Sequence, residues 1–320
     1  MMSKDKDPHH DIIAQILEKE FAAEPCRITR MGNGICNEVY SVETADREVI
    51  VRLKAEARYM LGSHNHIPIF RSKGISVPEI LAEDYSGTFV QLAYQVLSKI
   101  EGRDIMNVID TLTDDQLRAI AGEISNVFDQ LRDVPNNGKF GVLWGDGDDL
   151  VESWAADIAR MSGVVIGWGT RTGVLDEQLE HILTWINTEY KGYFESVQPV
   201  TYFGDICAKN VMIHDGRFAG LVDLDSLAQG DPLEAIGRIK ASWHGTHYGK
   251  VYADAVMDAQ RLTAEQRKLV TMYALLNRTY WTMENGIQFN QNTGSTVDRV
   301  REKEDKAVVA ALLEELKNPS

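Results

Sequence analysis

A carboxylate, an amide and two further carboxylates are closely spaced in the second half of the chain. Four residues separate Asp205 from Asn210, and Asp223 and Asp225 follow shortly afterwards. Carboxylate and amide oxygens are ligands that Mg²⁺ prefers, and a carboxylate that stays free of the ion can accept a hydroxyl proton. This combination suits phosphoryl transfer, in which metal ions neutralise phosphate charge and a base orients the attacking oxygen.

The segment between these residues predicts a β-hairpin. Two apolar runs, Val211–Ile213 and Phe218–Val222, flank His214–Arg217, which contains the turn-forming pair Asp-Gly. An antiparallel hairpin would place Asn210 at the start of one strand and Asp223 at the end of the other, so that both could bind one ion. The alternative is a surface hairpin in which Asp and Asn occur by chance.

These motifs together resemble the signature of the aminoglycoside phosphotransferase family, which includes choline-kinase-like and other small-molecule kinases. The matching residues are Phe203-Gly204-Asp205, Asn210, Val222-Asp223 and Gly230-Asp231-Pro232. The resemblance implies that Asp205 is the catalytic base, that Asn210 and Asp223 hold magnesium, and that Asp225 is a neighbouring acid. Phe203 stands where the family usually has His, which leaves the supporting hydrogen bonds of this loop open.

A glycine-containing turn near the start of the chain resembles the loop of this family that covers the nucleotide phosphates. Gly32, Gly34 and Asn37 precede the strand-like run Val39–Val42. Glycine lets backbone N–H groups approach phosphate oxygens without an intervening side chain. An ordinary hairpin turn would have the same local pattern.

The next strand, Glu48–Leu53, carries one cation, Arg52, at the place where kinases put the basic residue that binds nucleotide phosphate. A guanidinium can bind phosphate through two parallel hydrogen bonds. Glu56 is the candidate acidic partner of Arg52 on the following helix, which we expect to be broken around Gly62–Asn65. The alternative is a solvated Arg on an edge strand and an exposed Glu.

Val77–Leu81 and Thr88–Leu92 read as further strands, and Tyr94–Asp104 resembles the segment that leads into the hinge of this family. We expect adenine to bind there through backbone N–H and C=O groups, with Ser98 and Ile100 as the contacting residues.

Apolar residues at three- and four-residue intervals make the rest of the chain helical. The expected helices cover residues 117–131, 150–161, 175–190, 263–284 and 297–316. The sequence thus predicts an α+β, bilobal protein-kinase-like fold. It has a small β-rich N-terminal lobe over residues 1–97, a hinge over 98–105, and a larger, mainly helical C-terminal lobe over 106–320.

Composition sets the broad class. The chain has 320 residues, 44% of them hydrophobic, and no apolar run of membrane-spanning length. Its charged first residues lack the apolar region of a signal peptide, so we expect a cytoplasmic protein with no membrane partner. The odd count of three cysteines argues against a disulfide framework.

A net charge of −15 makes nucleic acid an improbable partner and suits a cationic substrate better. One hypothesis is that Asp231, Glu234 and Glu284 bind the amino groups of an aminosugar or a quaternary amine. An ordinary acidic surface is the alternative, and the oligomeric state is left open.

The expected activity is therefore transfer of the γ-phosphoryl group of ATP, with Mg²⁺, to a hydroxyl of a small and aminoglycoside-like molecule. Several alternatives stay open. They are a nucleotide-binding regulator without transferase activity, a kinase of an amino alcohol or sugar, a metal-dependent phosphohydrolase, and use of GTP instead of ATP.

Overall fold

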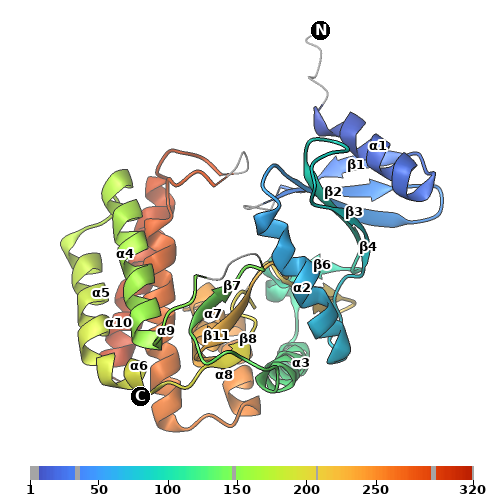
Figure 1. Ribbon diagram of the computed structural model, residues 1–320. Helices are drawn as coiled ribbons and strands as arrows, with labels where there is room; N and C mark the ends of the chain where they lie inside the picture. Colours follow the sequence, from blue (N-terminus) through green and yellow to red (C-terminus); the bar gives the residue numbers. More distant parts are fainter. Residues whose placement is uncertain (1–6, 33–36, 146–148, 207, 290–292, 319–320) are drawn as a thin grey trace.

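The structure is a computed structural model that describes residues 7–32, 37–145, 149–206, 208–289 and 293–318. A strand-rich N-terminal lobe sits on a larger lobe made mostly of helices, and the central helix α2 lies where the two lobes meet (Figure 1). The predicted α+β, bilobal fold is confirmed.

The N-terminal sheet is antiparallel, and its strand order is β1-β2-β3-β5-β4. The strands are β1 (Arg27–Arg30), β2 (Glu38–Glu43), β3 (Glu48–Lys54), β4 (Ile80–Asp84) and β5 (Ala93–Ser98). Successive side chains of a strand point to opposite faces. Val49, Val51 and Leu53 of β3 accordingly share one buried apolar cluster with Ile13 of helix α1 (His9–Phe21). Arg52, between them, faces the other lobe.

Helix α2 (Arg58–Ser72) is continuous, so the expected break around Gly62–Asn65 is wrong. Gly62 does not form a turn, and it allows the helix to approach the backbone of Asp225 closely. A Cβ atom at this position would lie 1.7 Å from the carbonyl oxygen of Asp225. The absence of a side chain therefore lets the helix press against the backbone that carries the candidate metal ligands.

One expected strand of the N-terminal lobe does not form. Thr88–Leu92 is a turn in which Gln91 has a φ of 58°, and the chain becomes extended only from Ala93 onwards. The strand expected at Val77–Leu81 is displaced towards the C-terminus, as β4. Both segments are apolar enough to be predicted as strands. Pairing with β5 determines which residues become extended, namely those of β4.

A second sheet, β10-β9-β6, carries the chain from one lobe to the other. Strand β6 (Arg103–Asp104) pairs with β9 (Val211–His214), which forms the predicted hairpin with β10 (Arg217–Leu221). In the turn, Asp215 and Gly216 have φ values of 48° and 73°. Positive φ at both central positions is what a two-residue hairpin turn requires.

The C-terminal lobe is built from helices around one apolar core and a small sheet of order β7-β11-β8. Two short 3₁₀ helices, η1 (Ile105–Asn107) and η2 (Ile109–Thr111), lead into it. The small sheet consists of β7 (Gly141–Leu143), β8 (Val200–Tyr202) and β11 (Leu227–Gly230). The helices are α3 (Asp114–Arg132), α4 (Trp154–Thr172), α5 (Glu177–Glu189), α6 (Lys191–Ser196), α7 (Leu233–Ser242), α8 (His247–Ala259), α9 (Ala264–Met283) and α10 (Arg299–Lys317).

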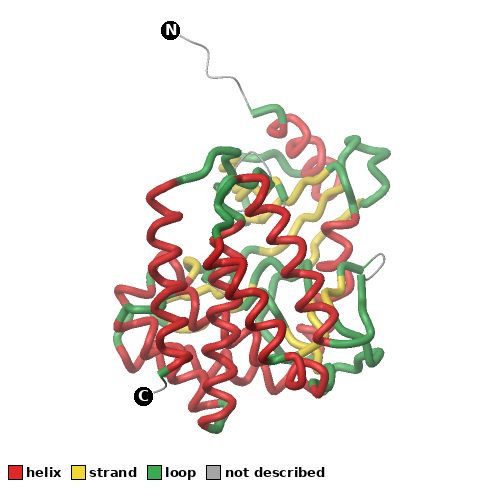
Figure 2. Tube along the Cα trace, turned by 90° about the vertical axis from the view of Figure 1, so that its left-hand side faces the viewer, coloured by secondary structure: helices red, strands yellow, loops and turns green. Residues whose placement is uncertain are grey.

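Side views place the long helices of this lobe beside one another below the N-terminal sheet (Figure 2). The five predicted helices correspond to α3, α4, α5, α9 and α10, and α4 begins and ends later than expected. Capping boxes at Thr113 and Thr263 start α3 and α9, because each hydroxyl accepts a hydrogen bond from the backbone N–H three residues on. Within the described residues, no helix is long and apolar enough to cross a bilayer.

Replacing Gly62 with alanine is expected to lower the free energy of unfolding by more than about 2 kcal/mol, because the new methyl group meets backbone that has to shift. Urea denaturation measures this change. Gly163 of α4 is the matched control, since a Cβ atom there meets nothing within 4 Å. Gly163→Ala should stabilise the protein by up to about 1 kcal/mol. Equal stability of Gly62→Ala and the wild-type protein would contradict the close approach.

Candidate active site

A cavity of about 830 Å³ lies between the two lobes. Asp205, Asn210 and Asp223 all line it, together with Arg52 and Ser98 from the N-terminal sheet. The sequence-predicted catalytic and metal residues therefore share one cleft, although they come from different elements.

Asp205 and Asn210 face each other across a short loop that follows β8. The Asn210 amide nitrogen donates to the Asp205 carboxylate at 2.7 Å and to the Asp205 carbonyl at 2.9 Å. Asn210 is 5% exposed, whereas the Asp205 side chain is 40% exposed. The amide thus fixes the orientation of a carboxylate that remains open to the cavity, as a base for an acceptor hydroxyl requires.

The hairpin brings Asp223 back to the same place. Its strands end with a hydrogen bond of 3.0 Å from the Val222 N–H to the Asn210 carbonyl, so Asp223 follows directly after the residue opposite Asn210. Asp223 has a φ of 58°, a left-handed conformation that costs a non-glycine residue of order 1 kcal/mol. The contacts on either side anchor this backbone, since the Leu224 carbonyl bonds to His66 and the Asp225 carboxylate accepts hydrogen bonds from Arg52.

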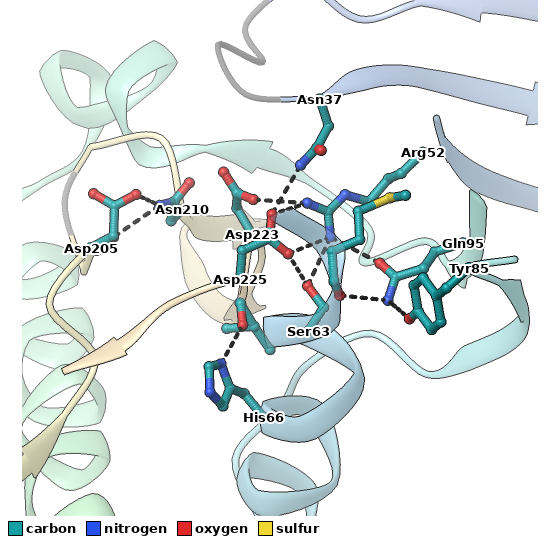
Figure 3. A network of polar contacts seen from close by, with 12 residues as sticks. Asn37, Arg52, Ser63, His66, Tyr85, Gln95, Asp205, Asn210, Asp223 and Asp225 are labelled. Carbon is teal, nitrogen blue, oxygen red and sulfur yellow. Dashed lines mark hydrogen bonds and ion pairs between the residues drawn. The ribbon is translucent and has the colours of Figure 1, made fainter. Parts of the chain in front are cut away.

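Asp225 is the centre of a buried hydrogen-bond network that joins both lobes (Figure 3). The Arg52 guanidinium donates to both of its carboxylate oxygens, at 2.9 Å from Nη1 and through a second, shorter contact from Nη2. The Asn37 amide donates to it at 2.9 Å, and the Ser63 hydroxyl of α2 donates as well. Arg52 and Asp225 are 4% and 7% exposed. A buried ion pair with this many additional hydrogen bonds meets the condition under which such a pair is tolerated.

Arg52 does not pair with Glu56, so that expectation is wrong. Glu56 is exposed, and the carboxylates that contact the guanidinium are Asp225 and, at 3.3 Å, Asp223. Nη1 also donates to Gln95, the residue opposite Arg52 on β5. The position on α2 that faces Arg52 carries Ser63, a hydroxyl that cannot neutralise a cation. The acid comes from the hairpin instead.

The glycine-containing turn lies only partly within the described residues. Gly34 lies outside them, and Gly32 is exposed without lining the cavity. Asn37 does line the cavity, and its amide holds Asp225, while its Oδ1 is buried without a hydrogen-bond partner.

The predicted hinge residues Ser98 and Ile100 line the cavity beside Ile50 and Leu97. The Ser98 N–H donates to the Glu79 carbonyl at 2.9 Å, which ties the end of β5 to the segment before β4. An apolar floor next to extended backbone suits a flat purine ring.

Phe203 and His66 connect two parts of the candidate site to helix α2, namely the loop that contains Asp205 and the turn that follows the hairpin. Phe203 is fully buried and packs edge-on against Phe70 of α2, with ring centroids 5.6 Å apart. His66, one turn earlier on α2 and 3% exposed, makes a 3.0 Å hydrogen bond through Nδ1 with the Leu224 carbonyl, between Asp223 and Asp225. The sequence contained no signal for this role, because it depends on where α2 docks.

The oxygen donors of this site fit Mg²⁺. Mg²⁺ usually binds one or two protein oxygens and takes its other ligands from phosphate and water. Asn210 uses its amide nitrogen for Asp205, which leaves Oδ1 available, and the Asp223 side chain is 47% exposed. Among the described residues, no cluster of three or more His, Cys, Asp or Glu side chains forms a metal site.

The electrostatic environment of Asp223 favours a bound cation. Desolvation raises the pKa of Asp223 above its usual value, and the negative charge of Asp225 acts in the same direction, while Arg52 opposes both. A cation placed against Asp223 would relieve this repulsion.

Two of the three predicted acceptor-binding acids do not line the cavity. Asp231 is buried and accepts hydrogen bonds from the hydroxyls of Tyr193 and Tyr273, so it holds helices together. Glu234 is also buried, and it accepts a hydrogen bond of 2.7 Å from Arg238 Nε. Glu284, at the end of α9, does line the cavity. Of the proposed contacts to an acceptor, only that of Glu284 remains possible in this structure.

Comparison with known proteins gives a consistent result. Residues 27–269 match the family described as "Phosphotransferase enzyme family". No curated protein matches the chain significantly.

Several solved structures share the fold. A thermostable mutant of aminoglycoside phosphotransferase APH(4)-Ia in its apo form superposes with a TM-score of 0.72 at 16% identity, covering 96% of this chain and 100% of that chain. The GDP complex of wild-type aminoglycoside 2'-phosphotransferase-IIIa superposes with a TM-score of 0.67 at 14% identity, and the match covers 97% of this chain and 99% of that chain. The gentamicin complex of APH(2")-IIa superposes with a TM-score of 0.63 at 12% identity, and the match covers 100% of this chain and 98% of that chain. At these identities the likeness concerns the fold.

Replacing His66 with leucine is expected to lower the free energy of unfolding by about 1–3 kcal/mol, because the buried Leu224 carbonyl loses its hydrogen bond. His64→Leu is the matched control on the same helix. The His64 side chain is 48% exposed and contacts Glu83, so the control should change stability by less than about 0.5 kcal/mol. Chemical denaturation of both variants measures the difference. Equal effects at the two positions would show that His66 does not support the turn at Leu224.

Proposed function

The chain belongs to the phosphotransferase enzyme family, and from this premise we propose that it transfers the γ-phosphoryl group of ATP, with Mg²⁺, to a hydroxyl of a small molecule. The observation that supports this most strongly is the presence of Asp205, Asn210 and Asp223 in one cavity between the lobes.

Each of these residues has a separate role in the proposal. Asp205 orients the acceptor hydroxyl and takes its proton, while the Asn210 amide keeps the carboxylate in place. The oxygens of Asn210 and Asp223 hold Mg²⁺, which neutralises charge on the phosphate groups when it is bound. Little covalent chemistry is then left for the protein, and positioning supplies most of the rate.

The nucleotide would lie along the N-terminal sheet. Ser98 and Ile100 border the place for adenine, and Gly32, Gly34 and Asn37 belong to the turn that would cover the phosphates. Arg52 contributes positive charge at the phosphate end. Its Nη atoms already donate to Asp223 and Asp225, so its main contribution is to hold the acidic turn that carries the metal ligand.

ATP is the proposed donor, and GTP is the alternative. Complexes of related folds contain AMP-PNP with hygromycin B, ADP with hygromycin B, or GDP. An aminoglycoside-like, cationic acceptor was expected from net charge and from three acids, but of these only Glu284 lines the cavity. The acceptor in this proposal is therefore a small hydroxylated molecule, and the cytoplasmic location stays a prediction.

The two sequence features that suggested a nucleotide-binding regulator without transferase activity are both accounted for by contacts in the structure. That alternative rested on Phe203 in the place of His and on the doubtful pair of Arg52 with Glu56. Phe203 packs against Phe70 of α2, and Asp225 pairs with Arg52, so the loop and the cation both have partners. No feature of the described residues favours a metal-dependent phosphohydrolase over a phosphotransferase, which is the class that the family indicates.

The first step of the test is nucleotide binding. A thermal-shift titration with Mg²⁺ and AMP-PNP should stabilise the wild-type protein by about 2.7 kcal/mol at 100 times the Kd. Asp223→Ala should lose the Mg²⁺-dependent part of this stabilisation. If Mg²⁺-nucleotide does not bind the wild-type protein, the proposal fails.

The second step separates binding from chemistry. Asp205→Asn keeps the size of the side chain and its contact with Asn210 but removes the base, so it should bind Mg²⁺ and AMP-PNP like the wild type. Its phosphoryl transfer from ATP, assayed with aminoglycosides, amino alcohols, hydroxy acids and sugars, should fall by at least about 100-fold. Full transfer by Asp205→Asn would remove Asp205 from the catalytic role.

A further inference from the structure

The cavity extends past Asp205 to a wall formed by α7, α9 and α10, and this wall is rich in cations. We name it the acceptor wall and define it by Arg238, Arg278, Glu284, Arg301 and Asp305, all of which line the cavity. These residues belong to three helices of the C-terminal lobe or, for Glu284, directly follow one of them, and α9 packs against both α7 and α10 (Figure 1). None of them has a role in the proposed chemistry of phosphate and metal.

Two guanidinium groups share one carboxylate on this wall. Arg278 Nη2 donates to Asp305 Oδ1 at 2.6 Å, and Arg301 Nε lies 3.4 Å from Asp305 Oδ2. Asp305 is buried, and the Nε of Arg278 is buried without a hydrogen-bond partner. One carboxylate cannot neutralise two guanidinium groups, so this pair keeps about one positive charge in excess.

Arg238 brings a third cation close to the catalytic base. Its Nη1 lies 3.8 Å from Asp205 Oδ1, while Glu234 contacts its Nε from behind. The Arg238 side chain is 29% exposed, and its partner Glu234 is 9% exposed. Of the two partners in this ion pair, the Arg238 guanidinium is therefore the more exposed.

The acid of the wall is also surrounded by cations. Burial raises the pKa of Glu284, and the charges of Arg238 and Arg301 oppose this rise. Lys209 of the catalytic loop also lines the cavity and acts on Glu284 in the same way. Glu284 is thus one carboxylate among several guanidinium and ammonium groups.

The charge of the cavity is opposite to that of the chain. Among the described residues that line it, seven are Lys or Arg and five are Asp or Glu, whereas the whole sequence has 33 basic and 48 acidic residues. Two of those five acids, Asp205 and Asp223, are needed for the base and the metal. Part of this excess of cations suits the phosphates of the nucleotide, and on the acceptor wall itself three arginines accompany two carboxylates.

We infer that the acceptor alcohol carries an anionic group, a carboxylate or a phosphate, which binds to the guanidinium groups of Arg278 and Arg301 while its hydroxyl reaches Asp205. Guanidinium groups bind both anions through paired hydrogen bonds. Trp243 and Trp281 also line this end of the cavity and offer apolar contact to the carbon skeleton. The inference rests on the proposed function, since it names the class of acceptor for the same site.

Matched alcohols that differ in charge test the inference. Glycerate, serine and glycerol 3-phosphate form the anion-bearing set, and glycerol, ethanolamine and hygromycin B form the neutral and cationic set. Each compound is titrated against the full-length protein saturated with Mg²⁺ and AMP-PNP, with binding read as a thermal shift, and is then assayed for phosphoryl transfer from ATP. Glycerate against glycerol 3-phosphate distinguishes a carboxylate from a phosphate.

Two arginine variants connect the preference to the wall. Arg301→Gln should raise the KM or the Kd of the best anionic compound by about tenfold, because a hydrogen bond to a charged group is lost. Arg299→Gln is the control on the same helix, since Arg299 is 66% exposed, contacts Glu302 and does not line the cavity. Arg301→Glu should reverse the preference, so that ethanolamine binds better than glycerate.

The outcomes separate the two proposals. The inference holds if an anion-bearing alcohol binds or reacts better than its neutral or cationic partner and if Arg301→Gln removes this preference while Arg299→Gln keeps it. The inference is overturned if no anion-bearing compound binds or reacts, or if Arg301→Gln and Arg299→Gln behave alike. Failure of the phosphotransferase proposal looks different, because the protein would then not bind Mg²⁺ and AMP-PNP at all.

Discussion

The buried ion pair between Arg52 and Asp225 is the constraint on which the site depends. Arg52 belongs to the N-terminal sheet and Asp225 to the turn after the hairpin, so their contact joins the two lobes beside Asp223, the proposed metal ligand (Figure 3). Asp223 lies two residues before Asp225 in a left-handed conformation. If Asp225 were not held in place, nothing would keep the strained backbone of Asp223 in the conformation that directs the Asp223 carboxylate to the cavity.

Helix α2 completes this arrangement from the other side. Gly62 lets the helix touch the backbone at Asp225, Ser63 donates to the same carboxylate, and His66 bonds the Leu224 carbonyl. Three residues of one helix thus contact two consecutive residues of the turn, Leu224 and Asp225. Phe203, in the loop that contains Asp205, packs against Phe70 of the same helix.

The sequence predicted those features that depend on local spacing. The interval from Asp205 to Asn210, the Asp-Gly turn and the strand that carries Arg52 are properties of short segments, and the structure has the expected hairpin and strand. The roles of His66, Ser63 and Asp225 depend on how α2 docks, which no short segment encodes. Glu56 was chosen for its nearness in sequence, and the ion pair instead spans 173 residues.

The residues that line the acceptor end of the cavity were also not evident from the sequence, for a similar reason. Asp231 and Glu234 are acids near the metal loop in sequence, but tyrosine hydroxyls and Arg238 enclose them. The side chains that line the far end of the cavity come from α7, α9 and α10, and their charges become visible only when these helices are assembled. The overall charge of a protein therefore does not determine the charge of its pocket.

A double-mutant cycle between Arg52 and Asp225 tests the central claim most directly, with the Kd for Mg²⁺ and AMP-PNP and the free energy of unfolding as readouts. Arg52→Met and Asp225→Leu should each destabilise the protein by about 3–5 kcal/mol, because each leaves a buried charge without its main partner, and the double variant should be no less stable than either single variant. Nucleotide binding should be weakened in all three. Additive losses of stability, or unchanged nucleotide binding in the single variants, would contradict the claim that this ion pair holds the site together.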